Sequence, residues 1–579
     1  MTLSPRGNSV PAAEFAHTLD TPRTARIQGH LSISFDRVGT LLLALVAVAL
    51  HVRFITSVGG LWRDETNSVN LATLPSFADT WRFLDYDSFP VLFFAVLRGW
   101  TTIFGANDVA LRALGLLTGL GILAALWANA RAFGVRWPLL AYALVGLNPM
   151  FIRYGDSTRA YGLGILLILL TMRSFWRLVE DSVPTSWRRI LPAAILGLLS
   201  VQCLYYNCVL LLAIAAGASA VAAARRHWRT VAIVLGLGLL AAASMLPYVP
   251  MIRRMGEWTF LVSYPADFAW LWKRVGEVIG SPSPVLIWLW TILFLIAVVL
   301  VATRFVKLFA ATNQPDRATG AIALPAAVTF AAVAMIVGVA GYALFLRVLN
   351  YYTQPWYYIT LVGFAACTLE AIFGEWSTKR TPTGSFFRGA RRTAAVLLLL
   401  AAFPAWQLLE TRHTNVDLLA AQLLPLAQSG DVILVPRWEC AITLARYYRG
   451  PAEIITLPPI GDHRFHRYDL VLQDMKTPEA VRPVLDRLEG TLRSGHRVFL
   501  AGTLPFANST VAPPSLPPLR RDDNGQWHGG PYYSVWDLQA AQFLRSHSTG
   551  AARVAVAIPN GARVQAFEDL ELGYIEGWR

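Results

Sequence analysis

The sequence is poor in charge and in cysteine. Of its 579 residues only 15% are charged, compared with about 25% in soluble domains, whereas 55% are hydrophobic and the mean hydropathy is +0.46. This composition excludes an ordinary soluble protein and indicates an integral membrane protein. The four cysteines are scattered and form no metal-type pair, so they indicate neither a disulfide framework nor a zinc site. The sequence also lacks a nucleotide-type glycine-rich loop and an internal repeat of fixed period.

Long apolar runs dominate the chain from residue 38 to residue 409. A helix of about 20 apolar residues crosses the bilayer core, and the runs predict about 11 such spans. They are placed at 38–57, 109–131, 137–153, 160–178, 190–204, 207–224, 230–247, 284–303, 321–346, 356–373 and 393–409. The formal net charge of +14 would suggest nucleic-acid binding in a soluble protein. Here the basic residues lie in short loops between the runs, so we expect no nucleic-acid partner.

The distribution of basic residues predicts the orientation. Alternate loops carry arginine and lysine with few acids, which makes that side cytoplasmic by the positive-inside rule. We therefore predict a multi-pass protein of the cell inner (plasma) membrane with its N-terminus in the cytoplasm. Residues 1–37 are polar, do not resemble a cleaved signal peptide, and are interpreted as a disordered cytoplasmic tail.

Residues 410–579 have a different sequence pattern, in which short apolar runs alternate with helix-like segments, and are predicted to form a soluble extracytoplasmic α/β domain. The runs "DVILV", "EIITL", "DLVLQ", "RVFLAG" and "RVAVAI" are typical of strands, and 416–429, 440–448 and 477–493 of helices between them. Within this domain "IGDHRFHRYD" holds Asp462, His463 and His466, which resemble a ligand cluster. We interpret this mixed-charge loop as solvated.

The first outward loop, 58–108, is too long for a simple connector. Its segments "NSVNLATL" and "FPVLFFAVLRGWTTIFG" are short or interrupted, and they fit helices lying in the membrane interface. If the second segment crossed the membrane, every later loop would change sides and the basic loops would face outward. The positive-inside rule therefore favours interfacial helices.

Asp64 and Glu65, in "GGLWRDETNSVNLA", follow the first predicted span. A carboxylate at this place can act as a general base, and a semi-apolar interface tends to raise the pKa of a carboxylate. An acid at this position is equally ordinary as a helix N-cap. For an isolated pair the cap is the simpler interpretation.

Other charged and aromatic residues are predicted at the same membrane face. Asp87 lies in "DYDSFP" and Arg112 opens the second span, while "RYGDSTRAYG" places Asp156, Arg159 and Tyr161 at the outer end of the third. Acids can deprotonate a hydroxyl, and arginines can hold a phosphate with two hydrogen bonds. Together they indicate group transfer from a phosphate-linked lipid, although each pair alone could be a solvated helix end.

Four blocks of the sequence, in order, resemble a known superfamily. They are "LWRDETNSVNLA", "DSFPVLFFAVLRGWTTIFGANDVALRALG", "LNPMFIRYGDSTRAYGLG" and "RVLNYYTQPWYY". The resemblance covers about residues 30–370 and is to polyprenyl-phosphate-sugar-dependent membrane glycosyltransferases of the C-type (GT-C) fold. This superfamily includes protein O-mannosyltransferases, lipid A aminoarabinose transferases and lipopolysaccharide galacturonosyltransferases. It implies an all-α polytopic membrane domain at 38–409, carrying the C-terminal α/β domain.

The resemblance also implies roles for single residues. Asp64 corresponds to the acid near the reacting centre and is the expected base, with Glu65 beside it for acceptor or structural contacts. Arg112 and Arg159 match arginines expected to neutralise the lipid phosphate. Asp87, Asp156, Tyr161 and Tyr351 complete the set predicted to bind substrate.

This sequence departs from the family pattern at three places. The block that usually reads like "HPPLYY" is "FPVLFF", so Phe89 replaces a histidine and Val91 a proline. Tyr205 and Tyr206 replace a His-Tyr pair, and "NYYTQP" stands where an Arg-Tyr pair usually precedes a late proline. A histidine-assisted metal site is therefore not indicated, and no cofactor is predicted.

The predicted function is transfer of a hexose or pentose from a polyprenyl-phosphate donor to an acceptor hydroxyl of a glycan, lipid or protein. Transfer is expected at the outer face and with inversion at the anomeric carbon. Two alternatives stay open: a polytopic transporter or flippase of lipid-linked sugars, and a scaffold whose outer domain binds envelope polysaccharide. The transporter is less favoured because the charges cluster at one face and no inverted repeat is seen.

Overall fold

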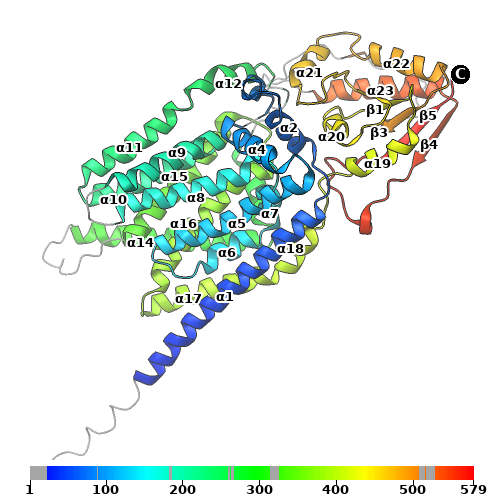
Figure 1. Cartoon of the computed structure of the whole chain (residues 1–579). Coiled ribbons are helices and arrows are strands. Elements are labelled where there is room, and N and C mark those ends of the chain that lie inside the picture. The colour runs from blue at the N-terminus through cyan, green and yellow to red at the C-terminus, as the bar shows by residue number, and fades with distance from the viewer. Residues whose placement is uncertain are drawn as a thin grey trace, which may run out of the picture.

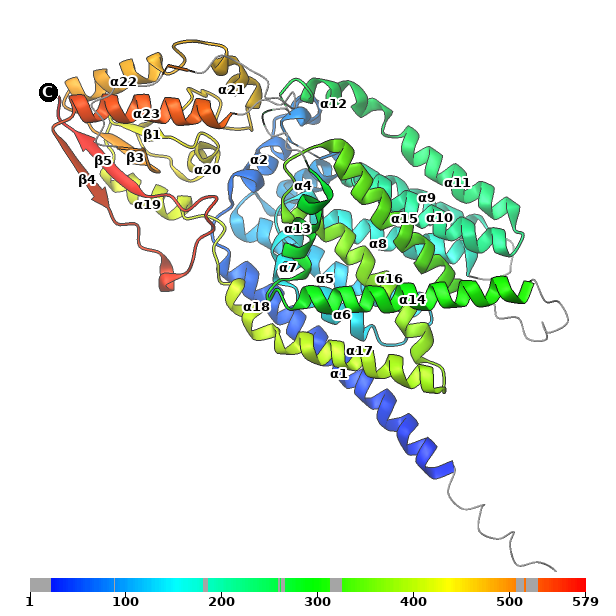
Figure 2. The ribbon, with the colours of Figure 1, turned by 180° about the vertical axis from the view of Figure 1, so that it is seen from behind.

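The computed structural model describes residues 22–87, 89–180, 186–258, 261, 266–312, 325–506, 515–516 and 529–579. A long helical bundle carries a smaller α/β domain at one end (Figures 1 and 2). Among the described residues, eight helical stretches are long and apolar enough to cross a membrane, and the chain is a multi-pass membrane protein. Two of them are parts of longer helices: Phe35–Ser57 of α1 (Pro22–Ser57) and Leu286–Arg304 of α14 (Leu286–Thr312). Five are whole helices: α5 (Asp108–Ala132), α8 (Ala160–Val179), α10 (Asn207–Ala224), α15 (Ala326–Leu349) and α16 (Ile359–Ser377). The eighth, Trp228–Met255, consists of α11 (Trp228–Ala243), η2 (Leu246–Tyr248) and α12 (Val249–Met255).

The remaining predicted spans take other forms. Residues 137–153 were predicted as one span but form two short helices, α6 (Leu139–Gly146) and α7 (Pro149–Gly155). The break has a local cause: the Oδ1 atom of Asn148 accepts a hydrogen bond from the backbone N–H of Phe151 at 3.0 Å, and Pro149 has no N–H to continue α6. Span 190–204 corresponds to α9 (Trp187–Cys203), and 393–409 to the end of α17 (Pro382–Leu400) followed by α18 (Ala402–Leu408).

Helix α1 begins at Pro22, inside the segment predicted to be a disordered tail. Residues 22–37 are therefore helical rather than disordered, which corrects that part of the prediction. Residues 1–21 lie outside the described residues.

The first long loop is largely helical and covers one end of the bundle. It contains α2 (Arg63–Ala72), α3 (Phe77–Arg82), η1 (Leu84–Tyr86) and α4 (Val91–Phe104). With 14 residues, α4 is about 21 Å long, too short to cross a bilayer core of about 30 Å. Its length agrees with the expectation of an interfacial helix. Two further short elements, α13 (Phe268–Ile279) and η5 (Pro355–Tyr357), complete the helical bundle.

The C-terminal domain, the described part of residues 410–579, is built around a five-stranded sheet of order β2-β1-β3-β5-β4. Strands β1 (Val432–Val435), β2 (Glu453–Thr456) and β3 (Val498–Ala501) are parallel, while β4 (Gly550–Val554) and β5 (Leu572–Glu576) add antiparallel pairs. Alternate residues of the buried strand β1 enter two separate apolar clusters, one on each face. One face is covered by α19 (Val416–Leu426) and α20 (Cys440–Tyr447), the other by α21 (Tyr468–Met475), α22 (Arg482–Arg493) and α23 (Gly530–His547).

Two of the predicted strands are wrong in type or extent. "DLVLQ" lies in the helix α21, and "RVAVAI" overlaps β4 only at its first two residues. A short apolar run does not distinguish a strand from one face of a short helix. The sequence reading also missed α23 and β5.

The C-terminal domain is hydrogen-bonded to the first long loop. The phenol of Tyr447 donates to Asp108 at 2.7 Å and accepts from the backbone N–H of Leu61 at 2.6 Å. Arg446 pairs with the same aspartate at 2.8 Å. The domain is thereby held against the start of α2, where Asp64 and Glu65 lie.

Candidate functional site

Asp64 and Glu65 are the second and third residues of α2 and point in different directions. Successive residues of an α-helix are separated by about 100°, so neighbours in sequence enter different environments. The side chain of Glu65 is 0% exposed, whereas that of Asp64 is 21% exposed. The structure therefore separates the two acids that the sequence places together.

Glu65 forms a buried ion pair with Arg112 of α5. The guanidinium donates to both carboxylate oxygens, at 2.5 and 3.0 Å, and also to the carbonyl of Gly60 at 2.9 Å. The backbone N–H of Thr158 donates to the same carboxylate at 2.8 Å. Burial raises the pKa of Glu65, but the positive charge of Arg112 and the nearby imidazole of His413, 3.8 Å away, lower it to about 2. Arg112 is consequently engaged with Glu65 rather than open to a ligand.

Asp64 keeps a partly accessible carboxylate. Its Oδ1 atom lies 3.3 Å from Nε2 of His466 and 3.6 Å from Nε of Arg63. Burial raises the pKa of Asp64, but the hydrogen bond from His466 and the positive charge of Arg159 outweigh that effect. The pKa therefore lies well below its usual range, and the carboxyl is ionised.

Arg159, the N-cap of α8, connects Asp64 to Asp87. Its Nη1 atom donates to the backbone carbonyl of Asp64 at 2.8 Å, to the hydroxyl of Ser68 at 2.7 Å and to Asp87 at 2.8 Å. The guanidinium also lies over the ring of Phe89, 4.4 Å from its centroid. Its Nε atom is buried and has no hydrogen-bond partner among the described residues. Three groups, one from Asp64, one from Ser68 and one from Asp87, thus share one nitrogen of this guanidinium.

Asp156 lies apart from this group. Its Oδ2 atom is 2.6 Å from Nδ1 of His51 in α1, and both side chains are almost fully buried. Gly119 of α5 faces the pair so closely that a Cβ atom there would lie 2.2 Å from Asp156. The predicted substrate contact of Asp156 is not supported by this geometry, because its carboxylate is enclosed between helices.

Tyr161 and Tyr351 belong to an aromatic wall beside Arg159. The ring of Tyr161 meets Phe89 edge-on at 5.1 Å and Tyr357 at 6.1 Å. Tyr351, just after α15, contacts Tyr357 at 6.0 Å. Burial raises the pKa of Tyr351; the negative charge of Asp64 raises it further, and the positive charge of Arg159 lowers it. Both predicted tyrosines therefore lie close to the charged group.

Sequence reasoning missed several residues that contact this group, and His466 is the most important. The interpretation of "IGDHRFHRYD" as a solvated loop is wrong for this residue, because its ring lies against Asp64. A usable signal was Phe465, a large apolar residue inside a charged segment, which is 0% exposed. Arg63, Tyr357 and His413 were likewise not singled out.

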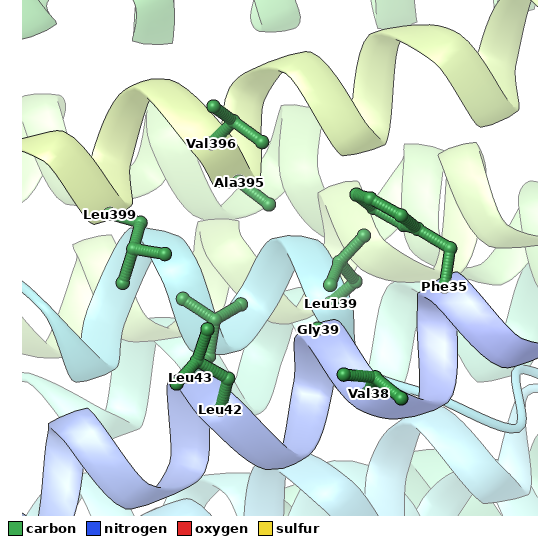
Figure 3. Close-up of a pocket in the computed structure, with 9 residues that line it drawn as sticks. All are labelled: Phe35, Val38, Gly39, Leu42, Leu43, Leu139, Ala395, Val396 and Leu399. Atoms are coloured by element: carbon green, nitrogen blue, oxygen red, sulfur yellow. The ribbon is translucent and has the colours of Figure 1, made fainter.

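Two further observations bear on cofactors and lipids. Among the described residues, no group of three or more His, Cys, Asp or Glu side chains could hold a metal ion. An apolar groove of about 460 Å³ lies between α1, α6 and α17, away from Asp64 (Figure 3). It is lined by Phe35, Val38, Gly39, Leu42, Leu43, Leu139, Ala395, Val396 and Leu399. It contains none of the predicted site residues.

Comparison with known proteins gives structural similarities only. No family model matches the chain, and no curated protein matches its sequence. ArnT from Cupriavidus metallidurans, in a crystal structure bound to undecaprenyl phosphate, has a TM-score of 0.45 and 13% identity over 80% of this chain and 92% of that chain. The archaeal oligosaccharyltransferase AglB from Archaeoglobus fulgidus, in complex with an inhibitory peptide and a dolichol-phosphate, has a TM-score of 0.43 and 10% identity over 81% of this chain and 70% of that chain.

Proposed function

We propose that this chain is a membrane glycosyltransferase that moves a sugar from a polyprenyl-phosphate donor to an acceptor hydroxyl. The observation that carries the proposal is the contrast among the predicted acids. Glu65, Asp87 and Asp156 have side chains at most 2% exposed and are paired with Arg112, Arg159 and His51, respectively. Asp64 is the acid of this set whose carboxylate remains accessible, and its backbone carbonyl accepts a hydrogen bond from Nη1 of Arg159 at 2.8 Å.

In the proposed reaction the acceptor hydroxyl attacks the anomeric carbon of the donor sugar. Its proton passes to the carboxylate of Asp64, and a bond forms between the acceptor oxygen and the anomeric carbon. The bond from that carbon to the phosphate oxygen breaks, and its electron pair leaves with the polyprenyl phosphate. Attack opposite to the leaving group inverts the configuration.

Arg159 is the proposed phosphate ligand. The donor is a phosphodiester with one negative charge, and the released polyprenyl phosphate is a monoester that carries up to two. A guanidinium fixed by three hydrogen bonds of Nη1 can stabilise that growing negative charge with its own positive charge. We assign Arg112 to holding Glu65 instead, because both of its terminal nitrogens are already engaged.

The site is proposed to face the outside of the plasma membrane. Helix α5 begins at Asp108, which is bonded to the C-terminal domain, and ends beside Arg131 at the other end of the bundle. The basic segments around residues 173–177 and 225–229 lie at that same end, because Trp176 donates to the carbonyl of Ala132 at 2.8 Å and Arg225 donates to the carbonyl of Val179. The positive-inside rule then supports a cytoplasmic location for the basic end and an extracytoplasmic one for Asp64.

The test is transfer by the purified full chain in lipid vesicles. Undecaprenyl-phosphate-linked radiolabelled hexoses and pentoses serve as donors, and delipidated or whole envelope glycan serves as acceptor. Asp64→Asn should lower turnover by about 10²–10⁴-fold, the usual cost of losing a general base, while leaving the binding of undecaprenyl phosphate intact.

Asp85→Asn is the matched control. Asp85 lies in the same loop but its carboxylate faces Arg254 at 3.3 Å, so turnover should stay near that of the wild type. Near-normal transfer by Asp64→Asn would remove Asp64 from the role. Movement of the intact lipid-linked sugar across the vesicle without transfer would favour the transporter instead.

A further inference from the structure

A short segment of the C-terminal domain is inserted into the membrane domain beside Asp64. We call residues 462–469 the docking loop. Phe465, at its centre, is fully buried within the apolar core of the helical bundle. Its ring stacks on Phe83 at 5.5 Å and on Tyr86 at 6.1 Å, both in the first long loop. The docking loop is therefore anchored by an apolar residue and not merely laid on the surface.

Polar contacts fix the register of the docking loop against α2. Asn67 accepts a hydrogen bond from the backbone N–H of His466 at 3.1 Å, and its amide group donates to Asp87 at 3.0 Å. Asn70 donates to the carbonyl of Arg464 at 2.8 Å. The loop is thus connected, through Asn67, to the same Asp87 that holds Arg159.

The imidazole of His466 reaches Asp64 from this anchored backbone. Its Nε2 atom lies 3.3 Å from Oδ1 of Asp64, and its ring stacks on Tyr468 at 6.1 Å with an angle of 20° between the planes. Trp438 meets the ring edge-on at 6.4 Å. The Nδ1 atom is buried and has no hydrogen-bond partner among the described residues. An ionised carboxylate only accepts hydrogen bonds, so Nε2 carries the proton in this contact.

We propose that His466 is a positioning residue for Asp64, so that the catalytic site is completed by the C-terminal domain. The N–H donated by Nε2 holds Oδ1 of Asp64 and leaves the other oxygen to receive the proton of the acceptor hydroxyl. This inference rests on the proposed function of Asp64 as the base. It assigns the C-terminal domain a part in the chemistry, because docking brings a side chain to the reacting carboxylate.

The charged groups around Asp64 and His466 determine what changes when His466 is substituted. Asp64 faces Arg63 on its own helix, Arg159 at the start of α8 and His466 from the docking loop. His466 faces Asp64 and the phenol-bearing ring of Tyr468. Removing the imidazole leaves both arginines in place, so Asp64 should stay ionised but lose its orientation.

The experiment compares His466→Ala with His466→Gln in the vesicle assay. A glutamine amide can place an N–H near the position of Nε2, whereas alanine cannot. For the alanine variant we expect kcat to fall by about 10–100-fold, the scale of a misplaced catalytic group, with the KM for the lipid donor changed less than about twofold. The glutamine variant should recover kcat to within about fivefold of the wild type.

His463→Ala is the matched control. His463 lies in the same docking loop, but its Nε2 atom is 3.2 Å from the carbonyl of Ile454 in the C-terminal domain. Its substitution should leave kcat unchanged. Hydrogen exchange of residues 462–469, equal in all variants, shows that the loop is still docked.

Several outcomes would overturn the proposal. Wild-type turnover by His466→Ala refutes it, and so does a glutamine variant as slow as the alanine variant, because an N–H donor at that position would then not restore the function of the imidazole. The contact is also read without turnover, by side-chain NMR of selectively labelled histidine. The ring signals of His466 should move in Asp64→Asn and not in Asp85→Asn. Unchanged His466 signals in Asp64→Asn would refute the contact between His466 and Asp64, even if transfer is observed. An active Asp64→Asn enzyme would instead refute the proposed function of Asp64 as the base.

Discussion

Replacing Glu65 by glutamine should unfold the protein more readily without acting on the chemistry. The carboxylate accepts two hydrogen bonds from Arg112, one from the backbone N–H of Thr158 and a longer one from Trp62 at 3.4 Å. An amide offers one acceptor oxygen, and its NH₂ group would face N–H donors. Arg112 would keep its positive charge in a buried place with the carbonyl of Gly60 as its remaining strong acceptor.

The size of the effect follows from this stranded charge. Removing one partner of a buried ion pair costs about 3–5 kcal/mol, a large part of a typical unfolding free energy of about 5–15 kcal/mol. Glu65→Gln/Arg112→Met removes the stranded charge as well, and the new amide can still accept from Thr158. The double variant should therefore be more stable than Glu65→Gln alone, although the carbonyl of Gly60 loses its guanidinium partner.

The assay measures unfolding and turnover on the same preparations. Purified variants in detergent are heated, the folded fraction is read by size-exclusion chromatography, and transfer is expressed per folded molecule. We expect a lower unfolding temperature for Glu65→Gln and a turnover within about tenfold of the wild type. If Glu65→Gln had normal thermal stability but lost more than about 100-fold in turnover, the structural role would be refuted. Glu65 would then have to act in the chemical step.

Three more predictions follow from individual groups. Burial raises the pKa of Glu568 from an ordinary 4.5 to about 7, although the positive charge of Arg63 acts in the opposite direction. The contribution of Glu568 to the free energy of unfolding is therefore fully present below about pH 4.5 and is lost as the pH rises through 7. Glu568→Gln should flatten this dependence, worth about 3 kcal/mol, in unfolding measured from pH 4 to 8. Gly119→Ala should destabilise by about 1–3 kcal/mol, because its Cβ would meet Asp156, and turnover per folded molecule should be kept. Since the pKa of Asp64 is lowered, kcat/KM should persist below the pH at which an ordinary aspartate is protonated, and an acid limb near pH 5–6 in the pH–rate profile would contradict this.

The sequence predicts the helical bundle well because its determinants are local. An apolar run long enough for a bilayer forms a helix wherever it lies, and most of the predicted spans correspond to single helices of the structure. The failures are local too. Asn148 and Pro149 end one helix and begin the next inside a predicted span, and this depends on a cap that an average over the apolar run does not register.

The candidate site could be predicted only in part, since its geometry depends on residues far apart in the chain. The adjacency of Asp64 and Glu65 suggested a shared role, but which of them faces the core is decided by Arg112, 47 residues further on. Asp156 matched a motif and yet faces His51, 105 residues earlier. His466 lies about 400 residues from Asp64, and no local pattern relates the docking loop to α2.

Arg159 couples the donor to the base in the proposed reaction. Its positive charge helps to hold the pKa of Asp64 low, which keeps the carboxylate ionised but makes it a weak proton acceptor. A bound phosphodiester brings a negative charge to the same guanidinium and offsets its effect on Asp64, so the proton affinity of Asp64 rises. As the sugar leaves, the phosphate gains charge and is stabilised more strongly by Arg159 in the transition state than in the ground state. In the proposed reaction the base therefore accepts a proton more readily when the donor is in place.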